Sequence, residues 1–334
     1  MRSRLHRLLA LGAFTALAGL MRAATPAPPV GISGPIEWAE IEPLAPKSLL
    51  LALAAAGTRL VSVGERGHVV LSDDEGRTWR QAAQVPTRVL LTGVCFADEQ
   101  HGIAVGHDET IVVTSDGGAR WTLAHQAPEA LKPLLDVWCG PGGRAIAVGA
   151  YMDYLTSDDY GSTWRPRKFE PAALARAAGE PLDYHLNRIA ALGTRFYIAA
   201  EGGHLYRSDD DAASWIELPS PYTGSFFGVL PLTREAVLAF GLRGHLYRSD
   251  DAGLHWREAP SGTLALLSGA ASYPGGLVVV GLSGAVLVSR DGGSSLTLHQ
   301  QDDRRGLSAV MAGTAGQLVV AGEGGARVIA VAAP

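Results

Sequence analysis

The sequence predicts an all-β fold built from repeated small sheets, and two observations carry the prediction. The pattern Ser-x-Asp-x-Gly-x-Thr-Trp at residues 157–164 recurs along the chain, with final positions at 79, 121, 164, 215, 256 and 296. The intervals between copies contain short apolar runs separated by turn-forming residues. A period near 42 residues indicates that each repeat is one supersecondary unit. We therefore expect a seven-bladed β-propeller of four-stranded antiparallel blades.

The second repeat shows how one blade is expected to form. Residues 91–96 and 103–106 are apolar, strand-like segments, and residues 110–114 run into the next copy of the pattern. Trp121 then begins a fourth, outermost strand, so the repeat contains four short strands with turns between them. The apolar second strands of other repeats, such as 145–149 and 237–241, are typical of strands packed on both faces.

The ends of the chain are expected to complete the ring. After position 296 three strand-like segments remain, at 307–311, 317–322 and 326–329, without a further copy of the pattern. Residues 36–40 have strand character and place Trp38 where a fourth strand would carry its tryptophan. We expect this N-terminal strand to close the last blade, because closure removes open sheet edges.

The recurring octapeptide, called the box below, is predicted to be a structural turn. Its aspartate accepts hydrogen bonds from the following amides, its glycine adopts a backbone angle that other residues resist, and its tryptophan fills the gap between blades. In one copy Ala212 replaces the glycine, and in another Leu296 replaces the tryptophan. The residues assigned this structural role are Asp74, Asp116, Asp159, Asp210, Asp251, Asp291, Trp79, Trp121, Trp164, Trp215 and Trp256.

The N-terminal residues predict export. Basic residues at positions 2, 4 and 7 precede an apolar run at 8–20, which is typical of a signal peptide over residues 1–24. Arg22 blurs the cleavage site, so a membrane anchor that is not cleaved stays open as an alternative. Residues 25–35 are expected to be a linker and residues 36–334 a single propeller in the periplasm.

The composition excludes some classes of function. The formal net charge of −5 is not that of a nucleic-acid-binding protein. Cys95 and Cys139 allow a disulfide, but two buried free thiols are the favoured interpretation. Their spacing to histidines indicates no metal site, and we expect no cofactor.

Several segments of the sequence resemble motifs of a known protein family. Gly102–Gly106, followed by Thr114–Gly118 and Trp121, resembles the photosystem II stability/assembly factor family, which is similar to the Asp-box (BNR-repeat) propellers. His185–Asn187, Pro221–Gly228 and Gly241–Gly244 resemble its exported relatives in non-photosynthetic bacteria. The resemblance implies a non-enzymatic propeller that binds a membrane-protein client during assembly, the client being a reaction-centre subunit in photosynthetic organisms. For this chain it implies a membrane-protein or envelope-complex client, and we expect a monomer.

A partner-binding face is expected where the loops that precede the innermost strands lie. We call these the lead-in loops; they share one face with the turns between the second and third strands, and the boxes lie on the other face. Basic or aromatic residues there would attract an acidic segment of a partner, although ordinary solvated loop charges explain them equally well. The residues assigned to this face are Lys47, Arg88, Lys132, His185, Asn187, Tyr222, Arg243, Arg304 and Arg305.

Two further features bear on function. The longest interval contains an insertion at 165–184, in which residues 171–178 favour a short helix ended by Gly179.

The alternative to a scaffold is a sialidase-like or xyloglucanase-like glycoside hydrolase, which needs paired carboxylates at the central depression. The acids available to it are Asp108, Glu109, Asp153 and Glu201, with Tyr151 nearby. The scaffold is preferred, and no residue is assigned as catalytic.

Overall fold

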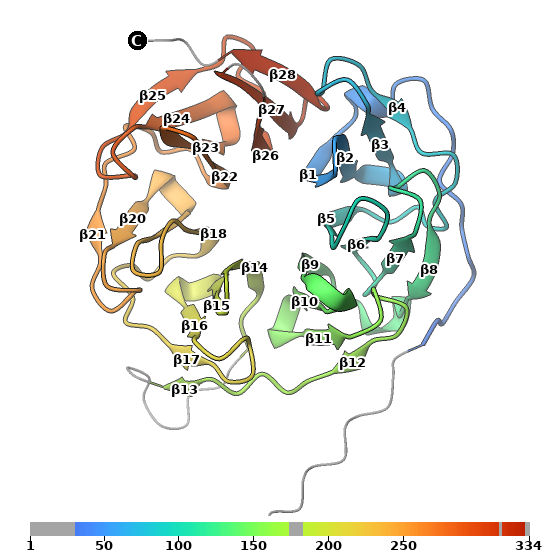
Figure 1. The fold of residues 1–334 in the computed structure, drawn as a ribbon, viewed down its shortest axis with the longest axis horizontal. Coiled ribbons are helices and arrows are strands. Elements are labelled where there is room, and N and C mark those ends of the chain that lie inside the picture. Colours follow the sequence, from blue (N-terminus) through green and yellow to red (C-terminus); the bar gives the residue numbers. More distant parts are fainter. Residues whose placement is uncertain (1–30, 174–182, 314–315, 331–334) are drawn as a thin grey trace, which may run out of the picture.

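The computed structural model describes residues 31–173, 183–313 and 316–330, and these residues form a ring of seven small sheets (Figure 1). Each sheet is one blade, and its strands follow one another outward from the centre of the ring, except that β13 (Ala172–Ala173) lies at the outer edge of its blade. The predicted seven-bladed β-propeller is therefore confirmed. The predicted signal peptide at 1–24 and most of the linker lie outside the described residues.

The first three blades each contain four antiparallel strands. Blade 1 comprises β1 (Leu50–Ala56), β2 (Arg59–Gly64), β3 (Val69–Ser72) and β4 (Arg80–Gln81). Blade 2 comprises β5 (Leu91–Phe96), β6 (Gly102–Gly106), β7 (Ile111–Thr114) and β8 (Thr122–His125). Blade 3 comprises β9 (Leu134–Cys139), β10 (Ala145–Gly149), β11 (Tyr154–Ser157) and β12 (Arg165–Pro166).

The remaining blades differ in strand number. Blade 4 comprises β13 (Ala172–Ala173), β14 (Leu186–Leu192), β15 (Arg195–Ala200), β16 (Leu205–Ser208) and β17 (Ile216–Glu217). Blade 5 comprises β18 (Phe226–Pro231), β19 (Val237–Gly241), β20 (Leu246–Ser249) and β21 (Arg257–Glu258). Blade 6 comprises β22 (Leu267–Tyr273), β23 (Gly276–Gly281), β24 (Ala285–Ser289) and β25 (Thr297–Gln300). Blade 7 comprises β26 (Leu307–Ala312), β27 (Gln317–Gly322) and β28 (Arg327–Ala330).

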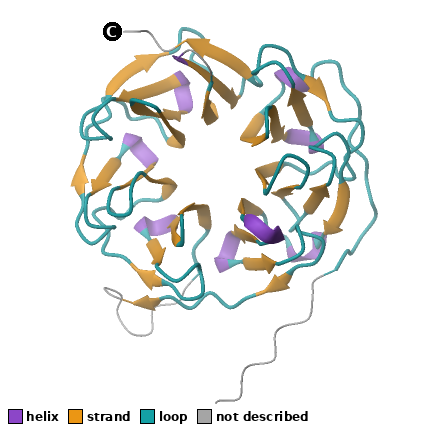
Figure 2. Cartoon of the chain, viewed as in Figure 1, coloured by secondary structure: helices purple, strands orange, loops and turns teal. Residues whose placement is uncertain are grey.

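The helical elements of the described chain are single 3-10 turns, shown in purple in Figure 2. Five of them connect the second and third strands of a blade, namely η2 (Glu65–Gly67), η5 (Ala150–Met152), η6 (Glu201–Gly203), η7 (Leu242–Gly244) and η8 (Leu282–Gly284). The turn η4 (Pro141–Gly143) connects β9 with β10. The turns η1 (Ala45–Lys47) and η3 (Pro128–Ala130) lie in lead-in loops. No helix in the described part of the chain is long and apolar enough to cross a membrane.

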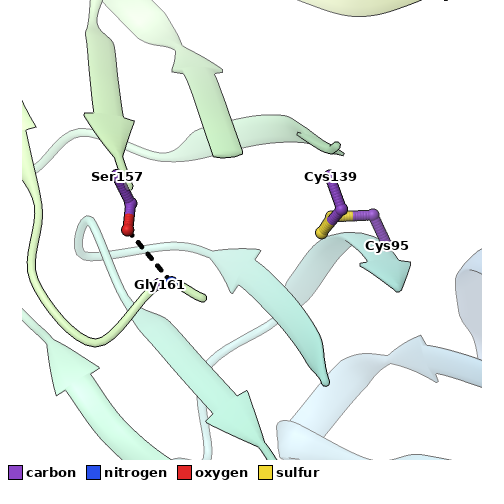
Figure 3. The surroundings of a disulfide bond; sticks show 4 residues. All are labelled: Cys95, Cys139, Ser157 and Gly161. Atoms are coloured by element: carbon purple, nitrogen blue, oxygen red, sulfur yellow. Dashed lines mark hydrogen bonds between the residues drawn. A yellow bond between two sulfur atoms is a disulfide. The ribbon is translucent and has the colours of Figure 1, made fainter. Parts of the chain in front are cut away.

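The box forms the turn that the sequence predicts. In blade 3 the Ser157 hydroxyl donates to Asp159 Oδ1 over 2.8 Å and accepts from the Gly161 amide over 3.0 Å (Figure 3). The Thr163 amide and hydroxyl donate to the two oxygens of Asp159 over 2.9 and 2.7 Å. In the equivalent turn of blade 1, hydrogen bonds from the Thr78 hydroxyl and amide lower the pKa of Asp74 to about 2. The aspartates therefore hold their own turns together.

The box also connects neighbouring blades. Trp164 is fully buried and packs with Ile103 and Val105 of blade 2, and its indole N–H donates to the Gly161 carbonyl over 2.8 Å. Gly161 has a φ of +80°, and a Cβ there would lie 2.8 Å from Ile103 Cδ1. In this copy of the box, the tryptophan therefore lies between blades 2 and 3.

Ala212 tests how strongly the box needs its glycine. Its φ of 63° lies in the left-handed region, which costs an L-residue about 1–2 kcal/mol. We expect Ala212→Gly to raise the free energy of unfolding by about 0.5–1 kcal/mol, since part of the relief is offset by the greater freedom of glycine in the unfolded chain. Gly161→Ala should lower it, because the added Cβ meets Ile103. Urea denaturation of both variants measures this, and a destabilised Ala212→Gly protein would contradict the strain.

The prediction that residues 36–40 close the last blade is wrong. These residues form no strand; the segment runs outside the ring past β4 and β8 (Figure 1), where the Ala39 amide donates to the Val85 carbonyl over 2.9 Å. Trp38 is 48% exposed. The described part of blade 7 has three strands, and side chains close the ring: Trp79 and Leu50 of blade 1 pack with Ala309 and Ala321 of blade 7.

Two further expectations need correction. Ala172–Ala173, where a helix was expected, form β13 and pair in parallel with β17, because the extended chain there completes the outer edge of blade 4; residues 174–182 lie outside the described residues. Cys95 and Cys139 form a disulfide rather than remaining free thiols (Figure 3). Cys95 is the penultimate residue of β5 and Cys139 the last residue of β9, and these innermost strands of adjacent blades place the two Cα atoms 5.6 Å apart, within the range that a disulfide requires.

Candidate functional site

The lead-in loops and the turns between second and third strands form one face, as the sequence predicts. Lead-in loops are hydrogen-bonded to the turn of the preceding blade through the backbone. The Gly67 amide donates to the Val89 carbonyl, the Glu109 amide to the Lys132 carbonyl over 2.8 Å, and the Met152 amide to the Tyr184 carbonyl over 3.0 Å. At Gly67, with a φ of +70°, a Cβ would lie 2.0 Å from the Thr87 carbonyl oxygen. This lead-in face is thus held by backbone contacts around the ring.

Three of the predicted partner-binding residues are already engaged with carboxylates. Arg88 pairs with Glu40 over 3.0 Å, so the segment outside the ring neutralises it. Lys132 pairs with Asp153 over 3.3 Å. His185 lies 3.6 Å from Glu201 and makes an edge-on contact with the exposed ring of Tyr151.

Asn187 has a structural contact. Its side-chain amide donates to the Phe226 carbonyl of blade 5 over 2.8 Å. The same position of the inner strand carries Thr92 in blade 2 and Ser268 in blade 6, whose hydroxyls donate to the Leu134 and Leu307 carbonyls over 2.7 and 2.6 Å. These side chains link the innermost strands of adjacent blades, so Asn187 stabilises the packing of blade 4 against blade 5.

Tyr222 belongs to an aromatic stack within blade 5. Its ring centroid lies 4.3 Å from that of His245 and 5.9 Å from that of Phe226. Phe226 is fully buried at the start of β18. Blade 4 repeats the arrangement with Tyr184 and His204, whose centroids are 3.9 Å apart. Tyr222 is therefore half-buried and presents only part of its ring to the face.

The remaining cations of the face are exposed and lack a carboxylate partner among the described residues. This group contains Lys47, Arg66, Arg243, Arg304 and Arg305. The acids of the same turns, in contrast, are occupied by backbone amides: Glu65 accepts from Leu49 over 3.1 Å, Glu201 from His185 over 3.1 Å and Glu323 from Gly306 over 2.7 Å. The lead-in face thus presents unpaired positive charge although the chain as a whole is acidic.

The box face has the opposite arrangement. Asp73 binds both Arg59 and Arg80, over 2.5 and 3.0 Å. The equivalent aspartates of two other blades also bind two arginines each, partly from other positions, with Arg195 and Arg207 on Asp209 and with Arg248 and Arg257 on Asp250. Arginines held in ion pairs are less available to an acidic partner than unpaired ones.

Sequence reasoning missed the exposed apolar side chains of the lead-in face. Leu131 and Leu264 are 80% and 86% exposed, more than any other large hydrophobic residue in the described chain, and both lie in lead-in loops. Tyr151 and Leu282 are also exposed, in the turns of blades 3 and 6. No sequence signal marks Leu264, because it begins an apolar run that continues through Leu266 into β22.

The central channel holds a charge pair that sequence reasoning also missed. A hollow there, with a volume of about 200 Å³, is lined by small and larger apolar residues and by Arg188. Arg188 Nη1 lies 3.5 Å from Asp136 Oδ1, and its Nη2 donates to the Ser268 carbonyl over 3.3 Å. Asp136 is buried, and burial raises the pKa of its carboxyl.

The four acids proposed for a hydrolase do not line this channel hollow. Glu109 lies 3.3 Å from the buried His125, and Glu201 accepts from the His185 amide. Asp153 differs from them, because burial and the neighbouring carboxylate of Glu109 raise its pKa while Lys132 opposes the shift. The pair Glu109–Asp153 therefore lies at the seam between blades 2 and 3. Among the described residues no cluster of histidine, cysteine or acid side chains could hold a metal ion.

Comparison with known proteins identifies the fold. A structure described as "YCF48 bound to D1 peptide" superposes with a TM-score of 0.68 at 15% identity, covering 91% of this chain and 99% of that one. YCF48 from Cyanidioschyzon merolae superposes with a TM-score of 0.67 at 15% identity, covering 87% and 97%. The chain shares the fold of the YCF48 propellers. The WD40 β-propeller domain of Doa1 gives 0.64 at 14% identity, covering 90% and 96%, so the likeness concerns architecture.

Sequence comparison adds little. No family model matches the chain. The uncharacterized protein YkuO of Bacillus subtilis (strain 168) is 28% identical over 120 residues, which are 35% of this chain and 38% of YkuO. The match thus spans little more than a third of the length of that relative.

Proposed function

We propose that the protein is a non-enzymatic scaffold that binds a membrane-protein or envelope-complex client through its lead-in face. The observation that carries the proposal is the unequal charge pairing of the two faces. Lys47, Arg243 and Arg304 are exposed without a carboxylate partner in the described chain, whereas the arginines of three box turns form ion pairs with Asp73, Asp209 and Asp250. Such a face attracts an acidic segment and orients it.

The comparisons and the architecture support this proposal. A propeller of the same fold has been solved with a peptide bound, namely YCF48 with D1 peptide. The lead-in loops rest on sheets through backbone hydrogen bonds, and the disulfide joins blades 2 and 3. A preorganised surface of this kind loses little conformational entropy when it binds.

We also propose that the protein is exported, with residues 1–24 as its signal, and that it acts as a periplasmic monomer without cofactor or bound nucleic acid. The disulfide supports this location, because such bonds persist in oxidising compartments. The net charge of −5 argues against a nucleic-acid partner.

The test is in-cell crosslinking followed by affinity capture of the tagged protein. A Lys47→Glu/Arg243→Glu/Arg304→Glu variant should capture at least about tenfold less of a membrane-protein partner than the wild type, since three attractive charges become repulsive. The matched control is Arg77→Glu/Arg120→Glu, which changes two exposed cations of the box face and should capture normally. Arg88 and Lys132 are unsuitable because they are already paired.

Two results would contradict the proposal at different levels. Equal capture by wild type and triple variant would exclude the lead-in cations as the binding surface. If the wild type captures no partner, the hydrolase becomes the leading alternative, because burial and the neighbouring Glu109 raise the pKa of the Asp153 carboxyl, as the general acid of a hydrolase requires. A glycan panel with wild type and Asp153→Asn would then show whether that pair is catalytic.

A further inference from the structure

The exposed apolar residues of the lead-in face gather at three separate places around the ring. Leu44, 66% exposed, precedes η1 at blade 1. Leu131 and Tyr151 belong to the lead-in loop and turn of blade 3, and Leu264 and Leu282 to those of blade 6. Blades 3 and 6 lie across the ring from each other, and blade 1 lies between them on the arc that runs through blades 2 and 7 (Figure 1). The apolar tips therefore surround the channel and point out of one face.

Each apolar site has a cation beside it. Lys47 ends the η1 turn that follows Leu44, and Lys132 follows Leu131 in sequence. The loop that carries Leu264 rests on the η7 turn that contains Arg243, since a Cβ on Gly244 would meet the Thr263 carbonyl. Arg304 lies against η8, which begins at Leu282, with its Cα 3.3 Å from where a Cβ on Gly284 would lie. Leucine next to a cation is typical of residues at a membrane interface.

The acids of these sites do not cancel the cations. Glu129, which is close to Leu131 in sequence, accepts a hydrogen bond from the Ser33 hydroxyl over 2.7 Å. Asp153 is paired with Lys132, and Glu323 accepts from the Gly306 amide. Asp303 pairs with Arg327 over 3.2 Å. Lys47, Arg243 and Arg304 thus have no ion-pair partner among the described residues.

We propose that the lead-in face lies flat on an anionic lipid bilayer, with the leucine tips of blades 1, 3 and 6 inserted between headgroups and the cations on lipid phosphates. A bilayer is a plane that meets all three tips at once, whereas a peptide segment contacts one part of the ring. Isolated tips suit a fluid interface, since no apolar groove joins them into the continuous patch that a protein partner buries. The lipid contact is independent of client binding and would place the scaffold beside membrane-embedded clients.

The test is flotation of the full chain with vesicles of phosphatidylcholine that contain roughly one third phosphatidylglycerol, compared with phosphatidylcholine alone. Wild type should bind the anionic vesicles more strongly, and added salt should weaken the binding. Leu131→Ser/Leu264→Ser should bind about tenfold more weakly, because two inserted side chains are lost. Arg243→Glu/Arg304→Glu should lose a similar factor, because two cations become anions.

Matched variants on the box face isolate the surface. Leu192→Ser/Leu254→Ser changes two leucines that are 45% and 42% exposed there and should bind as wild type does. If both leucine variants bind like wild type, the N-terminal residues 8–20 or another surface carries the binding and the proposal is wrong. If the wild type captures its client but binds no vesicle, the lipid proposal is wrong and the face binds protein alone. If it binds vesicles and captures no client, the lipid contact is supported and the proposed scaffold function is wrong.

Discussion

Replacing Trp164 with alanine should lower the free energy of unfolding by about 3–5 kcal/mol. Trp164 is fully buried in the seam between blades 2 and 3, where it packs with Ile103, Val105 and Leu155. Its removal leaves a cavity that the surrounding strands cannot fill, because both blades are fixed in the ring. It also leaves the Gly161 carbonyl without its donor at 2.8 Å. We expect a decrease in melting temperature of roughly 6–10 °C.

Trp38→Ala is the matched control. The same atoms are removed from a side chain that is 48% exposed on the segment outside the ring, so the loss should stay below about 1 kcal/mol. Chemical denaturation of both variants beside wild type gives the comparison. Similar losses for the two tryptophans would mean that the box tryptophan is not what holds the seam.

The ring itself was predictable because its determinants are local and repeated. The Ser–Asp–Gly–Thr hydrogen bonds of Asp159 and Asp74 form within five residues of sequence, so the pattern of residue types specifies the turn. The period then determines the number of blades. The shared face of lead-in loops and turns followed from strand direction alone.

The prediction that residues 36–40 form the fourth strand of blade 7 is wrong because it depends only on the types of residue in that segment. Its side chains fit a strand pattern, but on the outside of blade 1 the Glu40 carboxylate pairs with Arg88 and the Glu40 carbonyl accepts a hydrogen bond from the Gln81 side-chain amide. These contacts exist only in the folded ring. The disulfide is a similar case, since Cys95 and Cys139 are 44 residues apart and only adjacent blades bring them together. Leu131 and Leu264 were overlooked because exposure depends on which loop residues point outward.

The charge pair of the channel shows most clearly what sequence alone does not give. The third residues of the seven inner strands occupy equivalent positions, and five of them are small: Ala52, Gly93, Gly228, Gly269 and Ala309. The other two are Asp136 and Arg188, which meet across the seam of blades 3 and 4. Gly93 makes room for the pair, because a Cβ there would lie 3.0 Å from the Asp136 Cα. Their partnership depends on neighbouring blades and carries no local signature.

Arg188→Met should lower the free energy of unfolding by about 2 kcal/mol at neutral pH. Methionine keeps the aliphatic packing but leaves Asp136 buried without its counter-charge, with hydrogen bonds from the backbone amides of Ile189, at 3.0 Å, and Val137. Burial already raises the pKa of Asp136 above its usual value, and loss of the opposing arginine raises it further. A carboxyl whose folded pKa exceeds the unfolded value destabilises the protein only where it must ionise. The loss should therefore be small near pH 4 and grow as the pH rises to neutrality.

Denaturation of Arg188→Met at several pH values, with the double variant Asp136→Asn/Arg188→Met beside it, separates charge from packing. Asparagine can still accept from the Ile189 amide but does not ionise, so the double variant should recover part of the stability at neutral pH and lose the pH dependence. A loss that is equal at all pH values and unchanged in the double variant would mean that Arg188 acts through its packing. Recovery would show that the pair exists to neutralise a charge enclosed at the centre of the ring.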